Sequence, residues 1–388
     1  MARLGDICRF QSGGTPSKNE PTYFNGTIPW ITTVALNGNI IDADDAVDWI
    51  TEKAIAESAA KIVPAHSIMV GTRVGVGKVA INAAPMSTNQ DIISLIGIDE
   101  NRWSKSYLCK FISGQNEFLN TQARGATIRG IKIDVLAELN IPDISLSEQR
   151  HIAAVLDKVS GMIALRKQQL AKLDELVKAR FVELFGEPET NTKGWPISNM
   201  GNLCSVGSSK RIYQSEQSSV GIPFWRVSDL TNLINTGVAT ENLYIPEKRY
   251  AELQAQGQVP VKGDILITSR GTLGQCYIVK ATDRFYFQDG MISWLSEYAD
   301  SITPLYISHL FSMPGFQKQI DSMQAGSTVA YLSIAMIKKL KVMIPDAETQ
   351  QQFATFVEQI DQCRLTIQRG LDKLEMLKKA LMQEYFGR

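Results

Sequence analysis

The stretch VGTRVGVGKVAI, residues 70–81, combines the residue types that hold phosphate groups: glycines, a hydroxyl, an arginine and a lysine. Glycine lets the backbone approach an anion closely, and Arg73 and Lys78 would neutralise its charge. A P-loop, however, requires glycine where Thr72 stands and Ser or Thr where Val79 stands. A dinucleotide-binding turn must open a helix, whereas the residues after Lys78 have the pattern of a strand. The spacing therefore disfavours a nucleotide-binding loop.

Patterns typical of other enzymes are also missing from the sequence. No Asp or Glu is followed two positions later by Lys, an arrangement with which many nucleases hold a metal and a water. The chain contains no Pro-Pro pair, which an amino-methyltransferase would use in the loop that grips a flipped base. It contains no GxSxG motif. These observations favour a protein without an active site of its own.

Composition sets broad limits on the class of protein. The 388 residues suffice for two or three domains, and 40 basic residues balance 40 acidic ones, so net charge indicates no particular partner. The five cysteines are far apart and only three histidines are present, which disfavours a structural zinc site and is typical of a reducing compartment. Because no long apolar run is present, we expect a cytoplasmic protein without membrane contact and without a cofactor or metal.

The distribution of charge is more informative than its sum. Four segments contain cations but no Asp or Glu: 58–90 with Lys61, Arg73 and Lys78; 118–133 with Arg124, Arg129 and Lys132; 190–215 with Lys193, Lys210 and Arg211; and 265–282 with Arg270 and Lys280. Cations beside glycines and hydroxyls suit DNA phosphates, and arginine can also bind guanine edges. A solvated loop explains any single residue equally well, but recurrence in both halves favours nucleic-acid contact.

The chain is a duplicated module. Residues 125–186 align with residues 326–387 without a gap, and this places Thr127 against Thr328 and Gln149 against Gln350. Upstream the match is looser: VPAHSIMVGTRVGVG resembles VPVKGDILITSRGTLG, and Gln90-Asp91 resembles Gln288-Asp289. The upstream parts of the two copies have therefore diverged, while the tails have not.

Each copy ends in a predicted long helix, at 145–186 and 346–388. Ser145 with Glu148 forms a capping-box pattern, and Asp346 takes the cap position in the second copy. Apolar residues then recur at heptad spacing, which indicates a coiled coil formed by the two helices of one chain. The alternative is that each helix packs only on its own domain. The seam residues are Leu156, Val159, Ile163, Leu170, Leu173 and Val177 in the first helix, and Val357, Ile360, Ile367, Leu371, Leu374 and Leu381 in the second.

The parts before the helices, 1–144 and 196–345, mix β-rich runs with helical stretches and are expected to be α/β or α+β domains. The polar, turn-rich residues 187–195 read as a linker. We predict strands at Ser67–Val70, Lys78–Asn82, Asp264–Thr268 and Cys276–Val279, and helices at Ser106–Asn120 and Leu305–Ser322.

Together these motifs resemble one family. LGDICRFQSGGTPS, IPWI, TRVGVGK, STNQD, GATIRGI and SEQRHIAAVLDKVSGMI in the first copy, with IPFWRVSDL, ITSRGTLG, FQDGMIS and GSTVAYL in the second, resemble the specificity subunit of type I restriction-modification systems. The resemblance covers essentially the whole chain. At the opening of the second copy, residues Gly207–Lys210 depart from the Gly13–Pro16 pattern of the first.

The resemblance implies two pseudo-twofold-related target-recognition domains joined by an antiparallel coiled coil, with each domain reading half of a split DNA site. It implies double-stranded DNA, two methyltransferase (modification) subunits and restriction (motor-nuclease) subunits as partners. Those partners would bind S-adenosylmethionine, ATP and Mg²⁺, methylate adenine and cut unmethylated DNA. A helix of about 38 residues spans roughly 57 Å, or ~17 bp at about 3.4 Å per base pair, so the two half-sites should lie within about two helical turns.

The candidate DNA contacts are the cations, hydroxyls and amides of these motifs, with one tyrosine: Thr15, Lys18, Thr72, Arg73, Lys78, Gln90, Arg124, Arg129, Lys132, Lys210, Arg211, Arg226, Ser269, Arg270, Gln288 and Tyr331. The competing interpretation is a protein scaffold in which the coiled coil carries two protein-binding domains, and an enzyme ranks third. Salt dependence distinguishes them, because a DNA-binding protein loses affinity for DNA steeply as salt rises.

Overall fold

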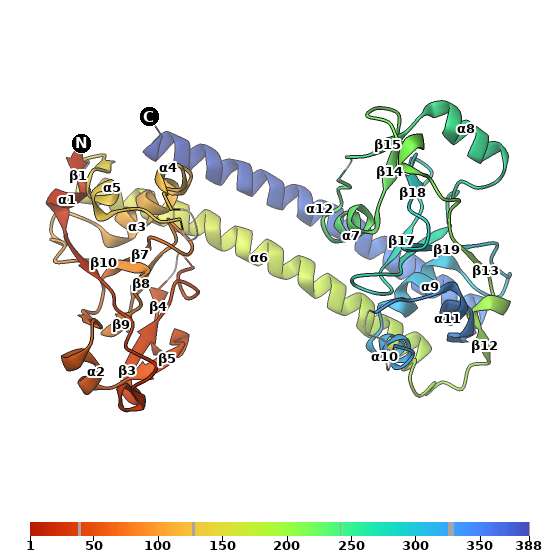
Figure 1. The fold of residues 1–388 in the computed structure, drawn as a ribbon, viewed down its shortest axis with the longest axis horizontal. Helices are drawn as coiled ribbons and strands as arrows, with labels where there is room; N and C mark the ends of the chain where they lie inside the picture. The colour runs from red at the N-terminus through yellow and green to blue at the C-terminus, as the bar shows by residue number, and fades with distance from the viewer. Residues whose placement is uncertain (38–39, 126–128, 241, 325–329, 388) are drawn as a thin grey trace. The chain divides into compact units, whose positions relative to one another are not determined.

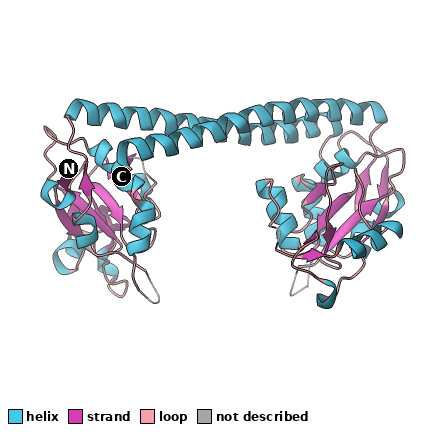
Figure 2. Cartoon of the chain, turned by 90° about the horizontal axis from the view of Figure 1, so that it is seen from above, coloured by secondary structure: helices cyan, strands magenta, loops and turns pink. Residues whose placement is uncertain are grey.

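The computed structural model describes residues 1–37, 40–125, 129–240, 242–324 and 330–387 (Figure 1). They form two compact units: unit 1 contains Met1–Lys167 and Arg369–Arg388, and unit 2 contains Gln168–Gln368. Both units mix strands and helices (Figure 2), which confirms the predicted α+β class. The predicted pair Thr127 and Thr328, with the middle of the Arg124–Lys132 run, lies outside the described residues.

Unit 1 contains two main sheets. The first has the order β2-β10-β7-β8-β4, with strands Arg9–Ser12, Ile92–Ile96, Ile68–Gly71, Val79–Asn82 and Ile40–Ile41. The second has the order β5-β3-β9-β6, with strands Asp48–Ile50, Phe24–Ile31, Met86–Thr88 and Ile62–Val63. A short pair joins β1 (Ala2–Arg3) to β11 (Asn140–Ile141). The helices of the domain are α1 (Leu4–Ile7), α2 (Glu52–Glu57), α3 (Lys105–Gly114), α4 (Asn116–Gln122) and α5 (Ile133–Ala137).

Unit 2 repeats this topology. Its first sheet has the order β13-β19-β16-β17, with strands Ser205–Gly207, Ile292–Ser296, Ile265–Thr268 and Cys276–Ile278. Its second has the order β15-β14-β18, with strands Tyr244–Ile245, Ile222–Trp225 and Tyr286–Phe287, and β12 (Ile197–Asn199) pairs with β20 (Lys341–Met343). The helices are α7 (Val227–Thr236), α8 (Glu247–Ala255), α9 (Pro304–Phe311), α10 (Pro314–Ser322) and α11 (Ile334–Lys339). The parallel pair of β3 with β9 in unit 1 corresponds to that of β14 with β18 in unit 2, so the sequence repeat is a repeat of the fold. Unit 1 also pairs β4 with β8 in parallel.

The four predicted strands are present, but the two predicted domain helices are wrong as single elements. Ser106–Asn120 is interrupted at Gln115, between α3 and α4. Leu305–Ser322 is interrupted before Pro314, between α9 and α10. Pro314 has no N–H to continue the helix, and its ring clashes with the preceding turn. A proline at the first position of the second helix therefore explains the break in unit 2.

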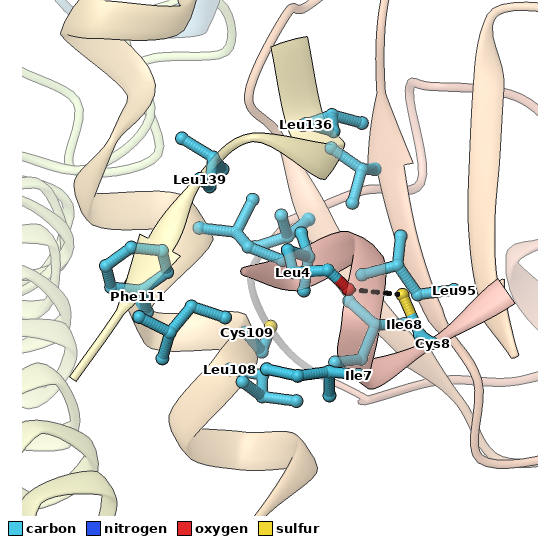
Figure 3. Close-up of a cluster of buried hydrophobic side chains, with 14 of the residues drawn as sticks. Leu4, Ile7, Cys8, Ile68, Leu95, Leu108, Cys109, Phe111, Leu136 and Leu139 are labelled. Carbon is cyan, nitrogen blue, oxygen red and sulfur yellow. Dashed lines mark hydrogen bonds between the residues drawn. The ribbon is translucent and has the colours of Figure 1, made fainter. Parts of the chain in front are cut away.

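The core of unit 1 lies between the first sheet and α3 (Figure 3). Leu4 and Ile7 of α1 meet Ile68 of β7 and Leu108 of α3 in one cluster of buried side chains. The Cys8 thiol donates to the Leu4 carbonyl at 3.4 Å. Burial raises the pKa of Cys8 to about 12, so this thiol stays protonated and acts as a small apolar side chain.

The two long helices are α6 (Leu146–Phe185) and α12 (Ala347–Phe386), of 40 residues each. The Ser145 hydroxyl accepts from the Glu148 N–H at 3.2 Å, and the Asp346 carboxylate accepts from the Thr349 N–H at 2.7 Å. Both predicted N-caps are therefore confirmed, and each satisfies one of the backbone donors that a helix leaves free at its start.

In each unit, segments of α6 and α12 pack side by side in opposite directions. In unit 1, Leu156 near the start of α6 shares a core with Leu381 near the end of α12. In unit 2, the rings of Phe353 near the start of α12 and Phe181 near the end of α6 lie 5.5 Å apart. Leu156, Val159, Val177, Val357, Ile360 and Leu371 of the predicted seam are buried, and Ile163, Leu170, Leu173, Ile367, Leu374 and Leu381 are half-buried.

Each helix also ends inside the core of a unit. Phe185 is fully buried in unit 2, with its ring 4.7 Å from Tyr306 and 5.3 Å from Phe353. Phe386 is buried in unit 1, with its ring 5.3 Å from Tyr107. Aromatic pairs at these distances add to the free energy of burying the rings. The helices therefore pack both on each other and on the domains, and the two readings of the heptad pattern are not exclusive.

A buried glutamine attaches the first turn of each long helix to its domain. In unit 1 the Gln149 side-chain amide donates to the carbonyls of Arg102 and Ile144 at 3.1 and 3.0 Å, and its oxygen accepts from Ser104 N–H at 2.9 Å. Gln350 does the same in unit 2, with Ser301 O, Pro345 O and Thr303 N–H each at 2.9 Å. Gln149 is 0% exposed and Gln350 3%, so water cannot replace these bonds.

We predict that Gln149→Met, which keeps the side-chain volume, destabilises the protein by at least about 1–3 kcal/mol, because it leaves buried backbone groups without partners. The measurement is the midpoint of chemical unfolding of the full chain. Gln168→Met, at an exposed position of α6, is the matched control and should change stability by less than about 0.5 kcal/mol. Equal midpoints for the two variants would contradict the role assigned to Gln149.

Candidate nucleic-acid interface

The glycine-rich stretch is the turn between the antiparallel strands β7 and β8. Gly75 and Gly77 have φ of 71° and 79°, a conformation that favours glycine. The Gly77 N–H donates to the Gly71 carbonyl at 2.9 Å, which closes the turn. Gly274 makes the corresponding bond to Thr268 O at 2.9 Å in unit 2, also with positive φ. Since a strand and not a helix follows, the turn offers no helix N-terminus to a pyrophosphate.

The turn places Arg73 between two hollows of unit 1. One hollow is lined by Arg73, Gln122, Arg124, Gly130, Ile131, Lys132, Asp134 and Val135. The other is lined by Arg73, Gly75, Val76, Lys78, Asn116, Asn120, Ala123 and Arg129. Five cations that the sequence predicted from two separate segments thus line adjoining hollows, which we call the cationic groove. Asp134 is the one acidic residue among the described residues that line it.

Backbone hydrogen bonds hold the two segments of the cationic groove together. Ile131 N–H donates to the Thr72 carbonyl at 2.8 Å, and Arg124 and Gly130 exchange two bonds of 2.9 Å. The Arg129 guanidinium donates to the Ala123 carbonyl at 3.3 and 3.0 Å. A Cβ at position 130 would lie 2.9 Å from Arg73 Cγ, so only glycine permits this approach without a shift.

Arg73 itself is available for contact. Its side chain is 54% exposed, and its nearest acid is Asp91, at 3.9 Å from Nη1 to Oδ1. A pair this long and this exposed contributes little to stability. Lys78 and Lys132 are exposed as well. Within the part of the chain that the structure describes, the groove therefore offers exposed cations that no close ion pair neutralises.

The structure corrects the prediction for two hydroxyls. Thr72 is 3% exposed and its Oγ1 donates to the Asp91 carbonyl at 3.1 Å. Ser269 is 1% exposed and its hydroxyl lies 2.7 Å from that of Ser293. Because both hydroxyls are buried and bonded inside the protein, they hold the turns in place and do not face a DNA backbone.

In unit 2 the position equivalent to the cationic groove keeps the backbone hydrogen bond but has fewer cations. Leu332 N–H donates to the Ser269 carbonyl at 3.0 Å, as Ile131 does to Thr72, so Tyr331 takes the place of Gly130. The Arg270 guanidinium lies 5.1 Å from the centre of the Tyr331 ring, a cation–π contact. Ala330 and Ser333 replace Arg129 and Lys132. Among the groove cations whose counterparts are described, only Arg73 has a cationic counterpart, Arg270.

The other predicted contacts of unit 2 are partly engaged within the protein. The Arg211 guanidinium binds the Asp289 carboxylate at 2.9 Å, and this hydrogen bond raises the pKa of Arg211. The Arg226 Nε lies 3.3 Å from the Asp229 carboxylate, which also accepts from the Arg226 backbone N–H at the start of α7. Lys210 is exposed, while its backbone N–H donates to the Tyr286 hydroxyl at 2.8 Å.

The remaining predicted residues lie apart from the cationic groove. In unit 1 the Thr15 hydroxyl donates to the Gln90 side chain and Lys18 is exposed. Gln288 is half-buried in unit 2 and is not the structural equivalent of Gln90. Its N–H donates to Trp225 O at 2.9 Å, as Asn89 N–H does to Ile31 O at 3.0 Å. Unit 2 thus has one extra residue before β19. The sequence alignment missed it because Gln90-Asp91 and Gln288-Asp289 are identical pairs.

Charge alone did not reveal two polar residues of the groove, Asn116 and Asn120, which line the hollow beside Lys78. Asn120 also donates to the Val76 carbonyl at 3.3 Å. Their spacing of four residues on one helix is the signal that could have found them, since it places both on one face.

No group of three or more metal-binding side chains occurs within the part of the chain that the structure describes. Among the same residues, no helix is long and apolar enough to span a membrane.

Comparison with known proteins now decides the family. The model described as the type I restriction modification DNA specificity domain matches residues 1–175 and 192–376, once in each copy. The chain belongs to this family. Its role is DNA specificity rather than catalysis, which disfavours the protein scaffold.

Proteins with similar sequences are also specificity subunits. The MjaIX specificity subunit of Methanocaldococcus jannaschii is 27% identical over 404 residues, which cover 98% of this chain and 91% of the relative. The EcoR124I/EcoR124II specificity subunit of Escherichia coli is 33% identical over 205 residues, 48% of each chain.

Two solved structures share the fold. The S subunit from M. genitalium superposes with a TM-score of 0.56 at 17% identity, covering 99% of this chain and 95% of that one. A chain from a study of type I restriction-modification complex assembly reaches 0.62 at 17% identity, covering 99% and 96%.

We predict that Lys78→Ala and Lys132→Ala each weaken binding to a mixed-sequence DNA duplex and lower the slope of log affinity against log salt by about 1, because each removes one phosphate contact. Neither lysine is buried, so folding should be unaffected. Fluorescence anisotropy at several salt concentrations measures the slope. Lys158→Ala, an exposed cation of α6, is the control; a slope that no groove variant changes would rule out phosphate contact at the groove.

Proposed function

We propose that this chain is the DNA-binding subunit of a type I restriction-modification complex and that each unit reads one half of a split, asymmetric site. The cationic groove of unit 1 is the observation that carries the proposal. Two sequence segments converge there on exposed cations, in a chain whose family supplies DNA specificity. Surface loops on a rigid scaffold commonly carry such binding residues.

The groove residues suggest a division of labour. Lys78 and Lys132, point charges on flexible stems, suit phosphates. Arg73, with its planar donors, suits a guanine edge, a contact worth about 1–3 kcal/mol of discrimination. In unit 2 the Tyr331 ring restrains the Arg270 guanidinium on one face and leaves its donor edge for a base. Because the two units differ here, the two half-sites should differ in sequence.

The outer faces of the long helices are the proposed docking surface for partner subunits. Exposed apolar side chains lie outside the heptad seam: Met162, Leu165, Met376 and Leu377 in unit 1, and Leu176 and Leu365 in unit 2. Leu165 is 61% exposed and Met376 64%. Exposed apolar side chains gathered along one element commonly mark protein interfaces. We propose that two methyltransferase subunits bind along these faces and that restriction subunits join them.

Catalysis in the proposed complex belongs to the partners. They would carry the S-adenosylmethionine for adenine methylation and the ATP and Mg²⁺ for translocation and cleavage. A cytoplasmic location, consistent with five free cysteines, completes the proposal.

Methylation mapping tests DNA reading directly. The chain is co-expressed with its methyltransferase partner in a host without adenine methylation, and long-read sequencing identifies modified adenines. We expect a two-part asymmetric motif with halves within about two helical turns. Arg73→Ala should relax one half and Arg270→Ala the other, with Lys158→Ala unchanged. A motif that is the same in all four proteins would exclude base reading by both arginines, and methylation that does not require this chain would overturn the proposal.

Assembly tests the docking surface. Leu165→Glu combined with Met376→Glu should reduce co-purification of the methyltransferase subunit at least about tenfold, because charge at an apolar interface costs free energy. Helix content by circular dichroism should not change, since both side chains are exposed. Gln254→Glu, at an exposed position of α8, is the control for added charge away from the long helices. Full assembly by the double variant would place the interface elsewhere.

A further inference from the structure

Unit 1 contains another hollow beside α4, the helix that also contributes Asn116, Asn120 and Gln122 to the cationic groove. It encloses about 720 Å³ between α3, α4, β11 and the last turns of α12. Gly114, Glu117, Phe118, Asn140 and Phe386 are among the residues that line it. We call it the Phe118 hollow, because the Phe118 ring stands in it with 46% of its surface exposed.

The corresponding place in unit 2 is covered by the linker. The gapless alignment of the two tails, carried back along the chain, pairs Gly114 with Gly315 and Glu117 with Lys318. A structural contact supports this register: Asn116 lies closest to a Cβ built on Gly77, as Gln317 does for Gly274. The Phe118 hollow and the equivalent, covered surface of unit 2 can therefore be compared residue by residue.

Linker residues occupy three of these positions in unit 2. The backbone of Glu189 lies against Gly315, where a Cβ would be 3.0 Å from Glu189 N. The Glu189 carboxylate binds the Lys318 ammonium at 2.7 Å. The Trp195 indole N–H donates to the carbonyl of Phe185, the counterpart of Phe386, at 3.0 Å. In unit 1 the Met382 side chain takes this place instead of a linker, with its Cε 2.5 Å from a Cβ built on Gly114.

Two substitutions distinguish the Phe118 hollow from its counterpart. Gln319 in unit 2 satisfies the Lys341 backbone, accepting from its N–H at 2.6 Å and donating to its carbonyl at 3.2 Å. Phe118 stands at that position in unit 1 and presents an apolar surface instead. Glu117 replaces Lys318, which reverses the charge that faces the linker.

We propose that the Phe118 hollow binds an extended segment of another protein chain, which lies as the linker lies in unit 2. The segment would displace the flexible Met382 side chain and place its backbone over Gly114, an apolar side chain on Phe118 and a basic residue beside Glu117. A basic residue follows from charge complementarity, because the linker carries Glu189 where its neighbour is Lys318. The inference does not depend on DNA reading.

The test uses the linker itself as the probe. Two fluorescent peptides are prepared, one with the sequence EPETNTKGWP of residues 187–196 and one with Glu189→Lys in that sequence. Their binding to the full chain is measured by anisotropy. We expect the peptide with lysine to bind about twofold to fivefold more tightly, the effect of one exposed ion pair. Phe118→Ala should weaken both peptides at least about fivefold, because an aromatic anchor is lost.

A charge reversal makes the assignment specific. Glu117→Lys recreates the unit 2 charge and should invert the preference, so that the unmodified peptide binds more tightly. Glu52→Lys, at an exposed glutamate outside the hollow, is the matched control and should leave the preference unchanged. The proposal is overturned if neither peptide binds saturably at millimolar concentration, if the unmodified peptide is preferred by the natural chain, or if Glu117→Lys leaves the preference as it was.

Discussion

The hydrophobic cores of both units depend on the burial of one phenylalanine side chain each. Phe386 packs against Tyr107 in unit 1, and Phe185 packs against Tyr306 in unit 2. Each ring ends a 40-residue helix whose first turn belongs to the opposite unit. Since aromatic burial contributes several kcal/mol per ring, the core of each unit depends on a helix that begins in the other. The chain is divided into units, but neither core is complete from one copy of the repeat.

The main features of the fold were predictable because they leave periodic signals. Helix caps at Ser145 and Asp346, the heptad seam and the alternation of strands all follow from residue type and spacing. The break before Pro314 was also readable, since proline cannot continue a helix. The break at Gln115 has a weaker signal in Gly114 directly before it, because glycine often marks the end of a helix but does not prevent one from continuing.

The candidate site was predictable only in part. Charge identified Arg73, Lys78, Arg124, Arg129 and Lys132 as candidates, because they lie in segments without acidic residues, and the structure places them around adjoining hollows. The Thr72 and Ser269 hydroxyls were misassigned, since each residue directly follows a buried strand, β7 or β16, and stays buried while the arginine after it is exposed. The register of Gln288 was also missed, because an insertion of one residue is invisible when similar letters follow it.

One backbone hydrogen bond in each unit affects how freely the side chains beside it can vary. Ile131 N–H to Thr72 O and Leu332 N–H to Ser269 O are both made between backbone atoms. Backbone atoms are the same in every residue, so these bonds form whatever side chains flank them. Gly130 in one copy and Tyr331 in the other already illustrate this tolerance. The bond itself therefore leaves the neighbouring side chain free to differ between the copies, and in unit 1 it is the close approach of Arg73 that restricts position 130 to glycine.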